Sequence, residues 1–225
     1  LALARQGARL ALASRNALRL ARLAEQCRAA GASAISVPTD VSQQAQCEAL
    51  IDQTVARYGC IDMLINNAGM AVGAFFRDLP DLSHFEYVMA VNYWGMVYCT
   101  HFALPHLIAA HGRIVNVSSL GGRVAIPGNT PYCSSKFAMQ GFSDSLRLEL
   151  ASHGVSVTVV SPYWVVTEFH EHMLNKDGQA AGPAGRSLYT RRMMSAETCA
   201  ARILSAVARR RRDLLMGPGS LAVLL

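Results

Sequence analysis

Two kinds of hydrophobic pattern alternate along the chain. Short runs of aliphatic and β-branched residues predict strands, and longer runs with apolar residues three or four positions apart predict helices. The predicted strands are Arg9–Ser14, Ala34–Thr39, Met63–Asn66, Arg113–Ser118, Val155–Ser161 and Asp213–Met216. The predicted helices are Ala17–Ala30, Ser42–Tyr58, a long or broken helix over Leu82–Ala110, Pro131–His153 and Ala196–Arg209. This alternation favours a parallel sheet with helices on both faces.

The whole chain reads as one α/β domain. Its 225 residues allow one large domain or two small ones, but no internal repeat and no shift in composition marks a boundary. The glycines and proline of Lys176–Arg186 predict a mobile loop. We therefore expect a single domain over residues 1–225.

Composition excludes several classes of protein. With 52% hydrophobic and 16% charged residues, the chain is neither disordered nor of low complexity. No run of about 18 apolar residues lacks a charge or a turn former, so no membrane-spanning helix is expected. The six cysteines show no C-x-x-C pair and no regular spacing, which favours reduced thiols over a disulfide framework or a zinc site. This pattern is typical of a cytoplasmic protein.

Arginines near the C-terminus account for much of the net charge of +6. They are Arg209–Arg212 together with Arg191 and Arg192. The plainer interpretation is a solvated helix end, where the helix dipole favours cations; the alternative is peripheral contact with an anionic membrane surface. No aromatic residues are interleaved with these arginines, so nucleic acid is not expected as a partner.

Polar or turn-forming residues follow five of the predicted strands. In open parallel sheets, ligands bind beyond the carboxyl ends of the strands. The residues at these ends are Ser14-Arg15, Asp40-Val41, Asn66-Asn67-Ala68-Gly69, Ser118-Ser119 and Pro162 to Thr167. Such a row suits a long ligand laid across the edge of the sheet.

Tyr132 and Lys136 form the sharpest pair. Four residues apart on a predicted helix, they share one face. A tyrosine phenol has a pKa of about 10 and is a poor acid–base group at neutral pH. A neighbouring ammonium stabilises the phenolate and brings it into range. Ser119, which ends a predicted strand, could hold an oxygen of the substrate.

Ser119, Tyr132 and Lys136, preceded by Asn66-Asn67-Ala68-Gly69 and by Asn92 in Val91-Asn92-Tyr93, resemble the short-chain dehydrogenase/reductase family. The resemblance extends from Leu3 to about Pro218. It implies a Rossmann-type, doubly wound parallel sheet in three α/β/α layers. It also implies hydride transfer between a nicotinamide cofactor and a carbonyl or secondary alcohol, with a substrate loop over about residues 168–192. A homodimer or homotetramer is expected.

The resemblance implies a role for each catalytic residue. Tyr132 would be the general acid–base, and Ser119 would hydrogen-bond the reacting oxygen. Lys136 would bind the nicotinamide ribose and lower the pKa of Tyr132. Asn92 would hold a water that continues a proton relay, or, as the alternative, brace a helix. Asn66, Asn67, Ala68 and Gly69 would support the sheet and pass close to the cofactor.

Further cofactor contacts follow from the same resemblance. Asp40 and Val41 would lie at the adenine, although Asp40 could instead be an acid that precedes a helix. Pro162 to Thr167 resembles the family's segment beyond the sixth strand, where the Val165 backbone would meet the nicotinamide carboxamide and Thr167 the phosphates. Tyr163 replaces the usual glycine there, so a turn with positive φ is in doubt. The alternative is that Tyr163 shapes the substrate pocket.

The end of the first predicted strand indicates NADP(H) rather than NAD(H). An acid at this position would bond the ribose hydroxyls and select NAD, but the chain reads Ser14-Arg15-Asn16, and the next acid is Glu25. Ser14 leaves room for a 2′-phosphate, and the Arg15 guanidinium can bind two of its oxygens. The alternative is that Arg15 points to solvent.

One departure from the family pattern is large. The family's first strand and glycine-rich phosphate loop would precede residue 1, so we expect a domain that lacks its first strand between Arg9–Ser14 and Met63–Asn66. A catalytically silent nucleotide-binding or scaffold homologue, an inactive fragment, and another dinucleotide-binding protein are the alternatives. No metal site is expected, because His170 and His172 lack the i, i+4 spacing of a zinc helix and an obvious third ligand.

Overall fold

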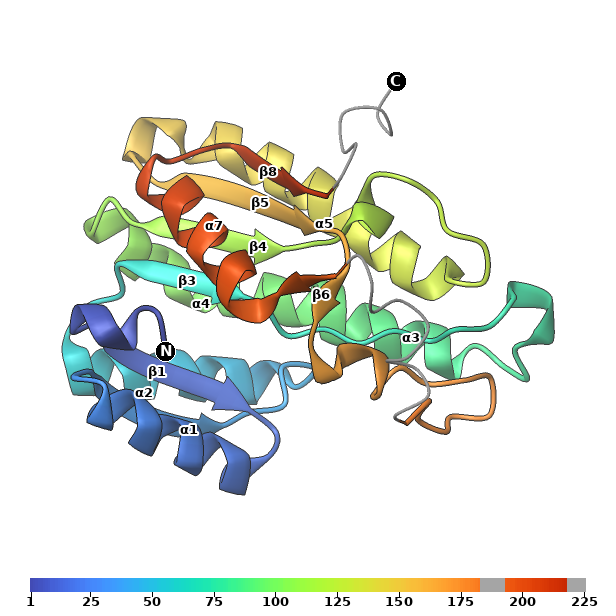
Figure 1. The fold of residues 1–225 in the computed structure, drawn as a ribbon. Helices are drawn as coiled ribbons and strands as arrows, with labels where there is room; N and C mark the ends of the chain where they lie inside the picture. The colour runs from blue at the N-terminus through green and yellow to red at the C-terminus, as the bar shows by residue number, and fades with distance from the viewer. Residues whose placement is uncertain (183–192, 218–225) are drawn as a thin grey trace.

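The predicted strands form two parallel ladders (Figure 1). The computed structural model describes residues 1–182 and 193–217. The first ladder pairs β1 with β2, and the second has the order β3-β4-β5-β8. Their bounds are β1 Arg9–Ser14, β2 Ser33–Pro38, β3 Met63–Asn66, β4 Arg113–Val117, β5 Ser156–Pro162 and β8 Asp213–Met216. Strand boundaries differ from the predicted ones by no more than a residue, as is usual at element ends.

Helices cover both faces of the second ladder. The main helices are α1 Ala17–Ala29, α2 Gln44–Tyr58, α3 Ser83–Met89, α4 Gly95–Ala109, α5 Thr130–Glu149 and α7 Ala196–Ala208. In Figure 1, α7 lies in front of the sheet, and α4 and α5 lie behind it. Successive residues of β4 point to opposite faces of the sheet. Ile114 packs in the hydrophobic cluster with α4 and α5, and Val115 packs in the cluster with α7. The expected three-layer α/β/α architecture of Rossmann type is confirmed.

The two ladders are separate. Within residues 1–182 and 193–217, β1 pairs only with β2, and β3 pairs only with β4. Ile65 in the middle of β3 is 39% exposed. A further parallel strand between β1 and β3 would find a free edge on each of them; that strand stays a prediction.

The long helix expected over Leu82–Ala110 is interrupted. A π-helical turn, Ala90–Trp94, separates α3 from α4. The spacing of apolar residues does not reveal the π-helical turn, because the turn inserts one extra residue into the helix while the same kinds of residue continue to face the core. Two short strands, β6 Val165–Val166 and β7 Met194–Ser195, pair with each other and escaped prediction because two residues carry no period.

The region of the predicted mobile loop is only partly described. Leu174 forms bridges with Val72 and with Ala180. Residues 183–192, which include Arg191 and Arg192 and complete the expected substrate loop, lie outside the described residues. In the part of the chain that the structure covers, no helix is long and apolar enough to cross a membrane.

The arginine run after α7 is partly used inside the protein. The Arg210 guanidinium donates to the Gly154 carbonyl at 2.6 Å and to the His111 carbonyl at 2.8 Å. Arg212 forms an ion pair with Asp144 at 3.0 Å. These contacts fasten the connection between α7 and β8, and membrane contact through this region stays a prediction.

A chain of buried amides and hydroxyls ties the strands to the helices behind them. The Asn66 amide donates to the Asn116 amide oxygen at 2.9 Å and to the Thr100 hydroxyl at 3.1 Å. The Asn116 amide donates in turn to the Ser143 hydroxyl at 2.8 Å. These side chains join β3, β4, α4 and α5, and each is buried. Their mutual satisfaction offsets the cost of burying polar groups.

Removal of the Asn116 amide should destabilise the protein. Asn116→Ala removes one hydrogen-bond partner each from the Asn66 amide and the Ser143 hydroxyl, at a cost of about 1–3 kcal/mol in the free energy of unfolding. Urea unfolding would compare this variant with Gln53→Ala, an exposed change on α2. Equal stability of the two variants would contradict this account of the network.

Candidate active site

Tyr132 and Lys136 lie one turn apart on α5, as their spacing predicts. Pro131 stands in the first turn of the helix, where its missing N–H leaves no helical hydrogen bond unmade. Lys136 is buried, and its ammonium donates to the Val117 carbonyl at 2.9 Å. Its Nζ lies 5.8 Å from the centroid of the Tyr132 ring. The helix thus places a phenol and a desolvated cation side by side at the carboxyl end of β4.

Ser119 reaches this pair from the loop after β4. It caps the short helix η4 (Leu120–Gly122), where its hydroxyl oxygen accepts from the Gly121 N–H at 3.1 Å. Its hydroxyl also acts on the Tyr132 phenol, whose pKa it lowers. η4 packs closely on α5, since a Cβ at Gly122 would lie 2.8 Å from the Lys136 carbonyl oxygen. Glycine at position 122 therefore allows the approach that brings Ser119 to Tyr132.

Asn92 is buried in the π-helical turn between α3 and α4. Its amide oxygen accepts from the Met70 N–H at 2.8 Å, and its amide nitrogen donates to the Met70 carbonyl and the Ser135 hydroxyl, both at 2.9 Å. Both N–H groups of the side chain therefore brace the segment after β3 against α5. This geometry supports the bracing alternative, and the relay water stays a prediction.

The pKa of Tyr132 differs from the expectation. Burial raises it to about 12, although the hydrogen bond with Ser119 opposes that shift. Burial also lowers the pKa of Lys136 to about 8. Loss of hydration destabilises both charged forms, so burial dominates the pKa of each group. The expected lowering of the Tyr132 pKa by Lys136 stays a prediction.

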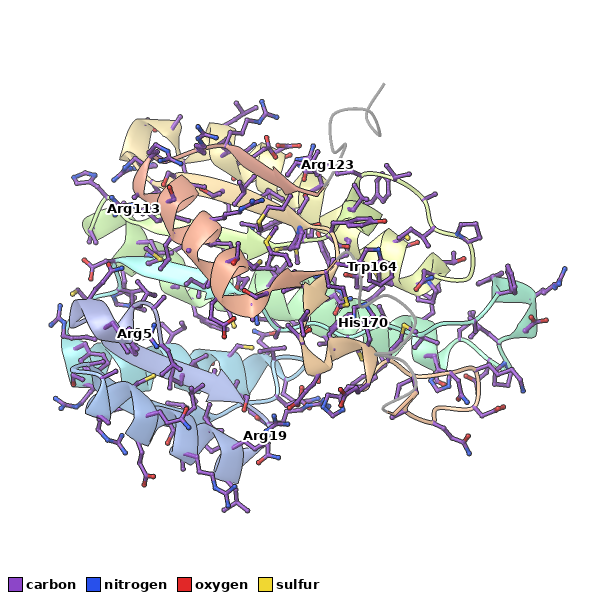
Figure 2. All side chains as sticks on the ribbon, viewed as in Figure 1. Arg5, Arg19, Arg113, Arg123, Trp164 and His170 are labelled. Atoms are coloured by element: carbon purple, nitrogen blue, oxygen red, sulfur yellow. The ribbon has the colours of Figure 1, made fainter. Side chains whose placement is uncertain are left out.

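Aromatic side chains that the sequence analysis missed cover Tyr132. Phe169, in the short helix η6 (Glu168–His170), lies with its ring centroid 5.9 Å from that of Tyr132. The ring centroids of His170 and Trp164 lie 4.9 Å apart, and Figure 2 shows these two residues side by side. Isolated aromatic residues in a loop carry no periodicity, so only their contacts reveal them. They give the site an apolar wall.

The residues after β3 divide into a buried and an exposed part. Asn66 points into the polar chain that ties β3 to β4. Asn67, Ala68 and Gly69 are exposed. A Cβ at Gly69 would lie 3.4 Å from the Asn92 amide oxygen and 3.6 Å from Nζ of Lys136. Gly69 therefore borders the Lys136 ammonium. The passage of this segment close to a cofactor stays a prediction.

Two cations stand at the carboxyl end of β1. Ser14 and Arg15 are exposed, and the Arg15 guanidinium donates to the Tyr87 hydroxyl in α3. Arg19, in the first turns of α1, binds both carboxylate oxygens of Glu168 at 2.8 Å and 2.7 Å. The sequence analysis missed Arg19, because an arginine on a helix surface shows no sign of a distant partner.

Asp40 and Val41 are engaged within the protein. The Asp40 carboxylate accepts from the N–H and the hydroxyl of Ser42, at 3.0 Å and 2.8 Å. Val41 packs on α4, where a Cβ at Gly95 would come within 2.7 Å of Val41 Cγ2. This geometry supports the alternative in which Asp40 shapes the entry to α2. Ser42, the predicted first residue of that helix, precedes it instead, and α2 begins at Gln44.

The segment from Pro162 to Thr167 continues from β5 as expected. Tyr163 keeps a negative φ and donates its N–H to the Met216 carbonyl at 2.8 Å. The turn with positive φ that was in doubt is therefore absent at this position. Val165 belongs to β6, and the hydroxyl of Thr167 accepts from the Phe169 N–H at 3.3 Å. The segment therefore leads directly to the aromatic cover.

Residues 1–182 and 193–217 contain no group of three side chains placed to hold a metal ion. His172 contacts the Glu168 carboxylate at 3.4 Å instead.

Comparisons with known proteins agree with this geometry. The short chain dehydrogenase family model matches residues 1–178. "11-beta-hydroxysteroid dehydrogenase-like 4A" from Arabidopsis thaliana is 41% identical over 160 residues, which are 71% of this chain and 53% of that protein. "11-beta-hydroxysteroid dehydrogenase 1A" from the same plant is 33% identical over 219 residues, 92% of this chain and 60% of that protein. The chain thus spans between half and two thirds of the length of these relatives.

Two solved structures share the fold. A short chain dehydrogenase/reductase from Burkholderia phymatum in complex with NAD gives a TM-score of 0.86 at 28% identity, covering 98% of this chain and 84% of that one. An alcohol dehydrogenase from the archaeon Thermococcus sibiricus, complexed with 5-hydroxy-NADP, gives a TM-score of 0.81 at 22% identity. The match covers 96% of this chain and 88% of that one. The match of the family model over residues 1–178, together with these likenesses, shows that the chain belongs to the short-chain dehydrogenase/reductase family.

Proposed function

We propose that the protein is an NADP(H)-dependent oxidoreductase that interconverts a secondary alcohol and a carbonyl compound. The observation that carries the proposal is the cluster of Ser119, Tyr132 and Lys136 at the carboxyl edge of the sheet. The family relationship supports the reaction class. The structural neighbours were solved with NAD and with an NADP derivative, so the choice of NADP(H) rests on this chain's own residues.

The residues at the strand ends fit a dinucleotide. The Lys136 ammonium has three donors, and the one hydrogen bond described for it, to Val117, leaves donors for ribose hydroxyls. Ser14 and Arg15 would hold the adenosine end, with Asp40 and Val41 beside the base. The remaining contacts would come from Asn67, Ala68, Gly69, Pro162, Val165 and Thr167. When bound, the nicotinamide supplies or accepts the hydride.

The chain's own residues handle the proton. The Tyr132 hydroxyl gives a proton to the carbonyl oxygen in reduction and takes it back in oxidation. The Ser119 hydroxyl donates a hydrogen bond to the same oxygen and orients it. The Lys136 ammonium favours the phenolate electrostatically, against the burial that otherwise raises the Tyr132 pKa.

The substrate is proposed to be an apolar alcohol or ketone. Phe169 forms one wall of the site over the Tyr132 ring, and Trp164 and His170 extend it. The names of the plant relatives point to hydroxysteroids, which match an apolar wall of this kind. Cytoplasmic location and assembly into homodimers or homotetramers stay predictions.

Tyr132→Phe should abolish turnover and leave nucleotide binding nearly intact. The change removes the proton donor, which contributes about 10²–10⁴-fold to the rate, but keeps the Lys136 ammonium. Steady-state assays and cofactor titrations of the full-length protein would be compared with those of Tyr98→Phe, a tyrosine on α4 that stacks on Trp94. More than a tenth of the original rate in Tyr132→Phe would overturn the role of Tyr132. Nucleotide binding without turnover in the unmodified protein would favour the silent homologue.

Arg15→Ala should reduce the preference for NADP over NAD. A guanidinium–phosphate contact contributes about ten- to a hundredfold to this ratio. Kinetics with both cofactors would be measured for the unmodified protein, for Arg15→Ala and for Arg22→Ala, which changes an exposed arginine on the following helix α1. An initial preference for NAD, or an unchanged ratio in Arg15→Ala, would show that Arg15 does not read the phosphate.

Cofactor affinity should fall as the pH rises through about 8, the pKa to which burial lowers Lys136. Below that pH the ammonium is charged and donates a charge-assisted hydrogen bond; above it the amine is neutral, and affinity drops about tenfold. Cofactor titrations between neutral and alkaline pH would test this, with Lys136→Met as the variant that lacks the group. An equal decline in Lys136→Met would assign the pH dependence elsewhere.

A further inference from the structure

Four ion pairs form a continuous network between η4, α5 and β8. Arg123, which ends η4, pairs with Asp213, the first residue of β8. Asp213 also pairs with Arg212 at 3.2 Å, and Arg212 pairs with Asp144 on α5 at 3.0 Å. Arg147, one turn further along α5, pairs with the same Asp144 carboxylate. The network therefore joins β8 to two elements, η4 and α5, that lie far from it in sequence.

The ion pair of Arg123 with Asp213 links the network to the active site and is partly shielded from solvent. Their side chains are 25% and 33% exposed, whereas that of Arg212 is 66% exposed. Exposed ion pairs add little to stability, and shielded pairs are less screened by solvent and salt. At the α5 end of the network, burial by itself raises the pKa of Asp144. Hydrogen bonds from Gln140, Arg147 and Arg212 have the larger combined effect and lower that pKa to about 2. The Asp144 carboxylate is therefore charged at neutral pH.

Both active-site elements are attached to this network. Ser119 caps the start of η4, and Arg123 caps its end, where the Arg123 N–H donates to the Leu120 carbonyl at 2.9 Å. α5 carries Tyr132 and Lys136 in its first half and Asp144 in its second. Figure 2 shows Arg123 near the end of β8, on the side of the molecule where α5 begins. Within this network, the edge strand holds η4 through the pair of Asp213 with Arg123.

η4 needs such an anchor because its backbone is weakly constrained. It contains three residues, of which Gly121 and Gly122 are glycines with no side chain to pack. Gly121 lies against the Tyr132 ring, where a Cβ would come within 3.2 Å of Cε1. A small rotation of η4 would therefore move the Ser119 hydroxyl away from Tyr132.

We propose that Arg123 and Asp213 are positioning residues, whose ion pair holds η4 so that the Ser119 hydroxyl stays in place beside the Tyr132 phenol. The inference rests on the proposed function for the roles of Ser119 and Tyr132. Neither Arg123 nor Asp213 takes part in the chemistry itself. Their contribution lies in the orientation of the groups that meet the reacting oxygen.

Asp213→Asn tests the proposal against Arg212→Gln in the full-length protein. Arg212→Gln breaks two other links of the network and leaves the pair of Arg123 with Asp213 in place. In Asp213→Asn we expect kcat to fall about five- to tenfold, as for a lost hydrogen bond, with the substrate KM changed less than about twofold. Asp213→Glu, which keeps the charge, should recover most of kcat. Arg212→Gln should keep kcat and lower the Tm at most slightly.

A second measurement reports the position of η4 without turnover. Amide hydrogen exchange at Gly121 and Gly122, whose N–H groups donate to Ser119, should quicken in Asp213→Asn and stay unchanged in Arg212→Gln. Where Asp213→Asn fails to fold, Arg123→Gln breaks the same pair. Equal effects of Asp213→Asn and Arg212→Gln on exchange and kcat would overturn the inference. Faster exchange in a protein that shows no turnover would contradict the proposed function and leave the anchoring role standing.

Discussion

Burial of the Lys136 ammonium is the constraint on which the rest of the site depends. A desolvated cation is unfavourable unless polar groups replace its water, and the Val117 carbonyl at the end of β4 is the partner that the fold provides. Burial lowers the Lys136 pKa to about 8, so the charge is retained near neutral pH at a cost in stability. Gly69 passes beside the ammonium, where an added Cβ would lie in van der Waals contact with Nζ at 3.6 Å. Charge and access are thus set by the same packing.

The groups around this cation are held by buried hydrogen bonds more than by apolar packing. Asn92 links the segment after β3 to α5 through Met70 and Ser135. Asn66 and Asn116 link the two strands beneath it. Asn66, Asn92 and Asn116 all have hydrogen-bond partners, so rearrangement would leave polar groups unsatisfied at a cost of about 1–3 kcal/mol each. Such a network favours one arrangement of the active site over others close to it.

The two ladders divide the proposed work between them. The β1–β2 ladder presents Arg15 and Arg19, while the β3–β8 ladder carries Tyr132 and its neighbours. They are joined where α2 packs on α4 and where Arg19 binds Glu168, one residue before Phe169. Because the cations and the proton-transfer groups stand on different ladders, changes in cofactor choice and in catalysis can be separated experimentally.

The sequence by itself determined the order of the elements and the pairing of Tyr132 with Lys136. Hydrophobic periods of two and 3.6 residues depend on which face is buried, and an i, i+4 spacing on a helix places two side chains together wherever that helix packs. The tertiary structure alone decided the π-helical turn at Asn92, the cover of Phe169 over Tyr132 and the raised Tyr132 pKa. These depend on contacts between segments far apart in the chain and on exclusion of water, neither of which a local pattern encodes.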